Sequence, residues 1–195
     1  MKRDEVEYWK SLYEVQRGVC STLNLEKILD LITSTAVEKM GVKASSIRLL
    51  DRDKDRLELV AANGLSEKYL KKGPVEVEKS QIDKECLEGK NVIVEDVSKN
   101  GRLLQYPDEA VKEKIASMLC TPLAIRGKTI GVMRVYSDKP HRFNSDEIEF
   151  LSALSGLGAM AIENARLYRL ALENLQDLTK ELWEKSEIWG KTKKI

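Results

Sequence analysis

The chain has 195 residues, enough for one globular domain with extensions and a substantial hydrophobic core. Charged side chains make up 33% of it while the formal net charge is only +1, which argues against a nucleic-acid-binding protein because such surfaces are usually basic. No apolar run reaches membrane-spanning length and MKRDEVEYWK has no signal-peptide stretch, so we expect a cytoplasmic protein without membrane contact.

Two helices are predicted at the N-terminal end of the chain. Alternating steps of three and four predict a helix from about Arg3 to Thr22, with a seam made by Val6, Trp9, Tyr13, Gln16, Cys20 and Leu23. Asn24 is a candidate N-cap for a second helix, LEKILDLITSTAVEKM, with Gly41 as its C-terminal stop. Its apolar residues recur on one side, so we expect that side to face the core.

The central part of the chain alternates short strands with short helices. We predict strands at residues 44–50, 56–64 and 91–96, an extended stretch at 75–79, and helices that begin at Ser66 and Ser80. The stretch SKNGRLLQYP has no hydrophobic period and is rich in turn residues. We therefore expect the segment from Ser98 to Asp108 to be an irregular and mobile cover.

A β-hairpin is predicted further along the chain. SMLCTPLAI and KTIGVMRVYS contain many β-branched and aromatic residues, which favour strands. The link at residues 126–128, RGK, suits a tight turn because glycine takes positive φ at little cost. We therefore expect Met118–Arg126 to pair with Thr129–Ser137 in a mainly antiparallel sheet of about six strands.

A long helix is predicted after this hairpin, with Ser145 as its candidate N-cap. Its apolar seam alternates strictly by three and four over about five heptads, which is typical of a left-handed coiled coil. Such a seam needs a partner in water, so we expect a parallel homodimer with a four-helix bundle. The expected interface residues are Trp9, Tyr13, Tyr168, Leu172, Leu175 and Leu182.

Four motifs in this order resemble the GAF domain family. They are TPL at Thr121–Leu123, RGKTIGVMRV at Arg126–Val135, FNSDE at Phe143–Glu147 and MAIENARLY at Met160–Tyr168. With the upstream helix and strands, the resemblance covers about Leu25 to Tyr168. It implies a mixed α+β, GAF/PAS-like fold, in which a mainly antiparallel sheet is flanked by helices and followed by a long C-terminal helix.

The resemblance also implies a division of the chain and a place for a ligand. We expect a dimerisation helix at residues 1–23, a GAF-like domain at 24–168 and a coiled-coil extension at 169–195. In this family the pocket lies between the sheet and its covering segment, here about Val77 to Ile115. The residues expected to line it are Ile47, Leu49, Ile82, Cys86, Val92, Val94, Tyr106, Met118, Cys120, Met133 and Val135.

Catalytic and metal-binding motifs are not found in the sequence. It has no GxGxxG, Walker A, GxSxG or HExxH motif, and His141 is the only histidine. Cys20, Cys86 and Cys120 are widely spaced and form no CxxC pair, so we expect reduced and mostly buried thiols rather than a zinc site. No cofactor is suggested by these residues.

The sequence is compatible with three functions. A sensory GAF domain would bind a small molecule or a separate signalling protein and signal through a helical dimer, without a catalytic output domain, and this is the function we expect. A second is catalysis like that of the free methionine-(R)-sulfoxide reductases, whose Gly-x-Cys-Gly element is replaced here by KSQID. A third is a dimerisation scaffold whose pocket is filled by its own side chains.

Overall fold

The computed structural model describes the backbone of residues 3–22, 24–51 and 55–192, and the side chains of 6–22, 24–51 and 55–180. The chain divides into two compact units, Met1–Ala161 and Ile162–Ile195. Helix α7 (Ser145–Thr192) contributes its first part to the first unit and its remainder to the second. Among the described residues, no helix combines the length and apolarity needed to cross a membrane.

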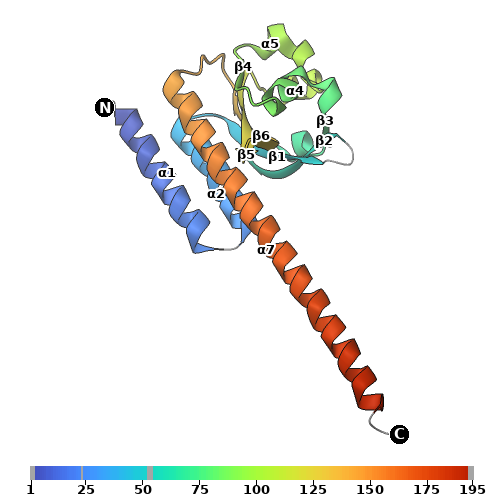
Figure 1. The fold of residues 1–195 in the computed structure, drawn as a ribbon. Helices are drawn as coiled ribbons and strands as arrows, with labels where there is room; N and C mark the ends of the chain where they lie inside the picture. The colour runs from blue at the N-terminus through green and yellow to red at the C-terminus, as the bar shows by residue number, and fades with distance from the viewer. Residues whose placement is uncertain (1–2, 23, 52–54, 193–195) are drawn as a thin grey trace. The chain divides into compact units, whose positions relative to one another are not determined.

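The first unit is built on one antiparallel sheet, with the strand order β3-β2-β1-β6-β5-β4 (Figure 1). Its strands are β1 (Ala44–Asp51), β2 (Arg56–Asn63), β3 (Val75–Glu76), β4 (Val92–Val94), β5 (Ser117–Ile125) and β6 (Lys128–Ser137). The predicted α+β fold with a mainly antiparallel sheet is therefore confirmed.

Strands β5 and β6 form the hairpin that the sequence predicts. Their pairing runs from Ser117 opposite Ser137 to Ile125 opposite Lys128. Between them, Arg126 and Gly127 have φ angles of 51° and 75°. Two consecutive positive φ angles are typical of the hairpin turns whose twist matches that of the strands. The turn chemistry is therefore as expected, although Arg126 as well as the glycine adopts the left-handed conformation.

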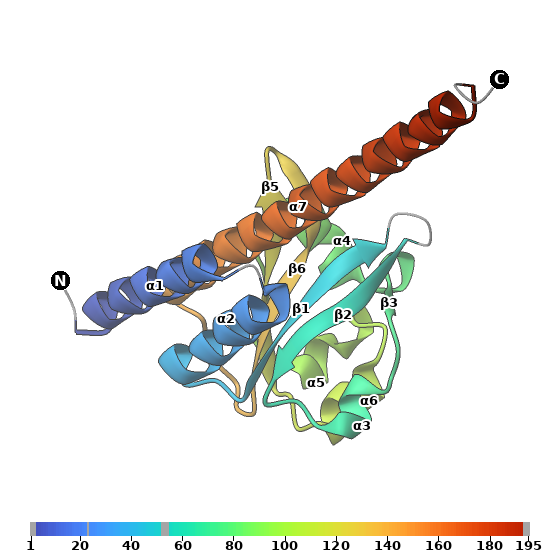
Figure 2. The ribbon, with the colours of Figure 1, turned by 90° about the horizontal axis from the view of Figure 1, so that it is seen from below.

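Helices α1 (Arg3–Ser21), α2 (Leu25–Met40) and the first part of α7 cover one face of the sheet (Figures 1 and 2). Ser45 Oγ donates a 2.7 Å hydrogen bond to the Thr33 carbonyl of α2. The hydroxyls of Thr121 on β5 and Ser155 on α7 lie 2.6 Å apart. These buried polar contacts fix where each helix crosses the sheet, which apolar packing alone does not specify.

Short helices cover the opposite face of the sheet (Figure 2). They are α3 (Glu67–Leu70), the 3-10 helix η1 (Val77–Lys79), α4 (Gln81–Leu87), α5 (Val97–Asn100), the 3-10 helix η2 (Gly101–Leu103) and α6 (Pro107–Lys112). The segment expected to be irregular is thus mostly helical. It is tied to the rest of the layer by a 3.0 Å hydrogen bond from the Tyr106 hydroxyl to the Pro74 carbonyl.

Helix α1 has two apolar sides. Val15 is buried, and the Tyr8 ring stacks on Phe150 of α7 with their centroids 4.2 Å apart. On the other side, Trp9 and Tyr13 remain 63% and 61% exposed. The predicted seam therefore contains these two exposed aromatic residues, while other residues of the helix pack on the domain.

The second unit is the remainder of α7. Tyr168, Leu172 and Leu175 of the predicted seam are 50%, 43% and 60% exposed in the single chain. Leu182 lies outside the residues whose side chains are described. Exposed apolar residues at this spacing are consistent with a seam awaiting a partner.

The N-terminal cap of α7 differs from the sequence-based expectation. Asn144 Oδ1 accepts a 3.0 Å hydrogen bond from the Glu147 amide, and Glu147 Oε2 accepts a 2.8 Å hydrogen bond from the Asn144 amide. This reciprocal arrangement is a capping box. The N-cap is therefore Asn144, and the prediction of Ser145 was wrong by one residue because both side chains are good caps by type.

The cap can be tested with two adjacent substitutions. Asn144→Ala removes the side-chain acceptor for the first turn, so we expect the free energy of unfolding to fall by about 1 kcal/mol. Ser145→Ala is the matched control and should change it by less than about 0.5 kcal/mol, because surface positions away from such features rarely do more. Urea unfolding followed by circular dichroism measures both. Equal losses in the two variants would contradict the assignment of Asn144.

Candidate ligand-binding site

Two arginines lie on the face of the sheet that the short helices cover. Because side chains alternate along a strand, Ser46 and Arg48 of β1 share a face. The pairing of β1 with β6 sets Ser46 opposite Arg134 and Arg48 opposite Val132. Arg48 and Arg134 are therefore diagonal neighbours, a spacing that long side chains readily bridge. Two positive charges are thus brought together beneath the covering layer.

Arg134 is paired with an aspartate from that layer. Its Nη2 donates a hydrogen bond to Oδ1 of Asp83 in α4, and the two side chains are 3% and 0% exposed. Burial acts to lower the pKa of Arg134, but the negative charge of Asp83 outweighs it and the pKa is raised well above its usual value. Arg134 therefore keeps its positive charge in the core.

Arg48 is fully buried, and no carboxylate of the described part of the chain is hydrogen-bonded to it. Its Nη1 donates a 3.3 Å hydrogen bond to the Leu57 carbonyl. Among the described residues, Nε and Nη2 of Arg48 and Oδ2 of Asp83 have no hydrogen-bonding partner. Burial, followed by the neighbouring charge of Arg134, lowers the pKa of Arg48. A buried charge without hydrogen-bonding partners destabilises the fold. Such a group is unusual in a protein core unless the position serves a function.

The backbone beneath Arg48 is fixed by a close approach of two strands. A Cβ atom added at Gly131 of β6 would lie 2.2 Å from the Arg48 carbonyl oxygen and 3.0 Å from Leu49 Cα. Such distances are not sterically allowed, so only glycine fits here without moving β1.

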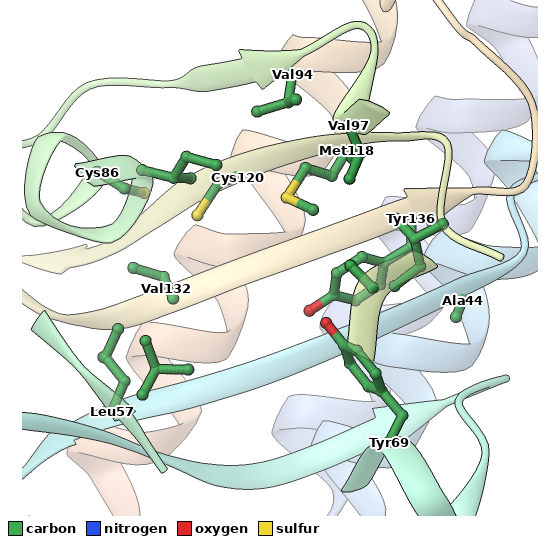
Figure 3. Packing of buried hydrophobic residues seen from close by; sticks show 14 residues of the cluster. Ala44, Leu57, Tyr69, Cys86, Val94, Val97, Met118, Cys120, Val132 and Tyr136 are labelled. Carbon is green, nitrogen blue, oxygen red and sulfur yellow. The ribbon is translucent and has the colours of Figure 1, made fainter. Parts of the chain in front are cut away.

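Two tyrosines border the arginines. The Tyr136 hydroxyl lies 2.9 Å from Ser46 Oγ, and the rings of Tyr69 and Tyr136 meet edge to face with centroids 6.2 Å apart. Figure 3 shows their hydroxyls pointing toward one another. Burial, followed by the proximity of Tyr136, raises the pKa of Tyr69. Tyr69 therefore remains a neutral phenol that can donate or accept hydrogen bonds.

A cavity of about 280 Å³ lies beside this cluster. It is lined by Ser66, Lys68, Tyr69, Lys71, Lys72, Tyr106, Glu109, Lys112 and Glu113. Lys72 Nζ sits 3.8 Å from the centroid of the Tyr69 ring and 5.0 Å from that of Tyr106. Burial, followed by the positive charges of Arg134 and Arg48, lowers the pKa of Lys72 to about 7. The cavity and the arginines are thus electrostatically coupled.

Cys86, one of two buried cysteines in this layer, is a poor nucleophile. Cys86 of α4 and Cys120 of β5 are both buried and free (Figure 3). A hydrogen bond with Cys120, followed by burial, raises the pKa of Cys86. Since the thiolate is the reactive form, this environment opposes thiol chemistry. Among the described residues, no group of three or more histidine, cysteine or acidic side chains could hold a metal ion.

The structure divides the predicted pocket residues between the two faces of the sheet. Seven belong to the layer beneath the short helices: Ile82, Cys86, Val92, Val94, Tyr106, Met118 and Cys120. Of these, only Tyr106 lines the cavity described above. Contact of the other six with a ligand stays a prediction.

The remaining four, Ile47, Leu49, Met133 and Val135, point to the opposite face. A Cβ at Gly158 of α7 would lie 4.0 Å from Ile47 Cδ1, and Met133 is opposite Thr121, which contacts α7. They therefore lie on the face that the long helices cover, and their contact with a ligand also stays a prediction. Both faces of β1 and β6 are buried, so apolar alternation could not show which face belongs to the pocket.

The polar residues of the site were not among the residues predicted from the sequence. They are Arg48, Tyr69, Lys72, Asp83, Arg134 and Tyr136. A signal existed for two of them, because Arg48 and Arg134 are charges in the interior of strands, each flanked by apolar residues on both sides. Charged residues are rarely buried unless they are paired or functional.

Comparison with known proteins identifies one family. The GAF domain model matches residues 22–163 of this chain. The GAF domain from Acinetobacter phosphoenolpyruvate-protein phosphotransferase is 24% identical with a TM-score of 0.73, and the match covers 86% of this chain and 97% of that one. No curated protein is similar enough in sequence to match.

Two further solved structures resemble the chain. Free methionine-R-sulfoxide reductase from Neisseria meningitidis, in complex with its substrate, is 18% identical with a TM-score of 0.71, and covers 86% of this chain and 95% of its own. Residues 122 to 287 of a methyl-accepting chemotaxis protein are 18% identical with a TM-score of 0.67. The match covers 79% of this chain and 98% of that one. At such identities these likenesses establish the fold alone.

The low pKa of Lys72 predicts a pH-dependent stability. In the unfolded chain the lysine keeps its proton up to about pH 10.5, whereas in the folded protein it loses it at about pH 7. Its cost to folding is therefore fully present below pH 7 and is relieved as the pH rises from there toward 10.5. We expect the free energy of unfolding of the wild type to rise over this window relative to Lys72→Met.

Chemical denaturation at intervals across this pH window measures the difference. Lys68→Met is the matched control, since Lys68 lines the same cavity but is exposed. It should leave the pH profile parallel to that of the wild type. Parallel profiles for Lys72→Met and the wild type would contradict the lowered pKa.

Proposed function

Because this chain belongs to the GAF domain family, we propose that it is a regulatory domain that binds a small molecule between its sheet and the layer of α3 to α6. The observation that carries this proposal is the buried guanidinium of Arg48, whose Nε and Nη2 have no protein acceptor among the described residues. A cavity of about 280 Å³ lies in the same layer, and its lining includes Tyr69 and Lys72, whose pKa values respond to the charge of Arg48. Concave sites with a few convergent polar groups are the usual places for small ligands.

Native mass spectrometry of freshly purified protein tests ligand binding directly. We expect a co-purifying small molecule, released on denaturation, that adds mass to the intact chain. A chain that carries no extra mass and binds nothing from a metabolite mixture would instead support a scaffold whose pocket is filled by its own side chains.

The proposal includes a homodimer through which the domain signals to a separate protein. Two apolar surfaces support it, and each lies within one unit. Trp9 and Tyr13 are exposed on α1 in the first unit, and Leu172 and Leu175 are exposed on α7 in the second. An isolated helix with such a stripe is marginal in water, and pairing with the same stripe of a second copy removes that surface from solvent.

Charges placed in the α7 seam should break this dimer. Leu172→Asp with Leu175→Asp puts four carboxylates into the interface of two copies, and each unpaired buried charge costs several kcal/mol. Leu170→Asp with Asn174→Asp is the matched control, because these positions lie on the opposite side of the helix. Light scattering should give a dimeric wild type and control and a monomeric seam variant. A monomeric wild type at micromolar concentration would contradict the dimer.

A second candidate function is the reduction of free methionine sulfoxide. The contact between Cys86 and Cys120 favours it, because two neighbouring thiols can form a disulfide while the sulfoxide oxygen leaves as water. The raised pKa of Cys86 argues against it. A regulatory domain remains the better-supported function.

The double variant Cys86→Ala with Cys120→Ala separates the two functions. We expect it to lose about 1–3 kcal/mol of stability, because both side chains are buried, and to keep its ligand. An assay of free methionine-R-sulfoxide with dithiothreitol as reductant is expected to show no turnover by the wild type. Turnover that disappears in the double variant would overturn the regulatory proposal. Cys20→Ala, at an exposed position, is the control.

A further inference from the structure

We propose that Arg48 binds the carboxylate of a small organic monoanion, and that this ligand also donates a hydrogen bond to Asp83. The inference rests on the proposed function, because it names the chemical class of the ligand for the same site. It concerns the buried polar cluster of Arg48, Asp83 and Arg134 and the adjacent residues Tyr69 and Lys72.

The unpartnered atoms of Arg48 form one edge of its guanidinium. Nη1 is used by the Leu57 carbonyl, while Nε and Nη2 have no acceptor among the described residues. The N–H bonds of Nε and Nη2 run parallel and match the two oxygens of a carboxylate or phosphate. The free edge is therefore the one that arginine uses for bidentate recognition of an anion.

The charge balance favours a carboxylate over a phosphate. Arg48 and Arg134 bring two positive charges into the core, and Asp83 brings one negative charge. The nearby Tyr69 and Cys86 are neutral, because burial and their neighbours hold their pKa values high. With Lys72 in the neutral form, which its lowered pKa of about 7 favours above that pH, a monoanion neutralises the cluster, whereas a dianionic phosphate leaves a net negative charge in the core.

Asp83 adds a second requirement. Its Oδ1 accepts from Arg134, while its Oδ2 has no donor among the described residues. A buried carboxylate oxygen gains substantially from a hydrogen bond. The monoanion that suits both groups carries a hydroxyl group near its carboxylate.

Access to Arg48 leads past two side chains of the covering layer. Tyr69 and Lys72 line the cavity, and the Tyr69 ring packs against Tyr136 on the sheet. The ammonium group of Lys72 rests over the Tyr69 ring. A ligand that enters from the cavity therefore meets these two side chains first.

Nuclear magnetic resonance of the full chain tests the proposal, with the side-chain Nε–H signal of Arg48 as the probe. Formate, acetate and glycolate are titrated at constant ionic strength, with glycolamide as the uncharged analogue of glycolate and inorganic phosphate as the competing anion. We expect the Arg48 signal to shift saturably with the carboxylates, most strongly with glycolate. Glycolamide should leave it unmoved, and phosphate should bind more weakly.

Three variants complete the experiment. Arg48→Met removes the charge, and Arg48→Lys keeps the charge but lacks the two parallel N–H donors. Both variants should therefore abolish the thermal stabilisation given by glycolate. Arg56→Met, at an exposed position on β2, is the matched control and should retain it. Without ligand, Arg48→Met should be at least as thermostable as the wild type, because an apolar side chain suits this core better than an unpaired charge.

Each other outcome overturns the proposal. No saturable shift with any of the three carboxylates, equal binding of glycolamide, or tighter binding of phosphate excludes a carboxylate on Arg48. A co-purifying molecule that binds Arg48→Met as well as the wild type would leave the proposed function standing and remove this inference. Failure of both the titration and the mass spectrometry would remove both.

Discussion

The ion pair between Arg134 and Asp83 holds the covering layer to the sheet. It joins β6 to α4 in the core, where water does not weaken the attraction. The surrounding apolar side chains supply most of the energy of packing, but dispersion and hydrophobic burial are not directional. The pair sets the position of α4, and the loss of either partner would leave an unpaired charge that costs about 3–5 kcal/mol.

The same pair explains why Arg48 has no carboxylate partner among the described residues. Asp83 has two oxygens and two arginines within its electrostatic reach, yet its only described hydrogen bond goes to Arg134. Arg48 is consequently held in the core by its strand and by one carbonyl group. An unpaired buried charge of this kind lowers stability, and such a cost is most often found at functional sites.

Much of the fold could be predicted from the sequence because its signals are local. The hairpin at residues 117–137 depended on two strand-forming stretches and a glycine turn, and Asn24 and Gly41 cap α2 as predicted. The cap of α7 was displaced by one residue because Asn144 and Ser145 are both suitable types. Pocket residues were harder to place, because β1 and β6 are buried on both faces and apolarity marks neither.

The helical side of the site could not have been located from the sequence. Asp83, Tyr69 and Lys72 lie in or beside helices of four and seven residues, whose place over the sheet depends on contacts distant in the chain. No periodicity is readable in such short elements. The charges of Arg48 and Arg134, by contrast, lay visible between apolar residues of two strands and indicated a buried polar site.

Because of Gly131, the sheet side of this site tolerates fewer amino-acid substitutions during evolution than the covering helices do. The side chains of α3 and α4 other than Asp83 can be exchanged one by one, so the shape and polarity of the cover can drift toward new ligands. The backbone contact at Gly131 leaves no room for even a methyl group, and any replacement would push the Arg48 carbonyl out of the sheet. Descendants of this chain are therefore free to alter the cover, while the strand position that holds Arg48 is inherited unchanged.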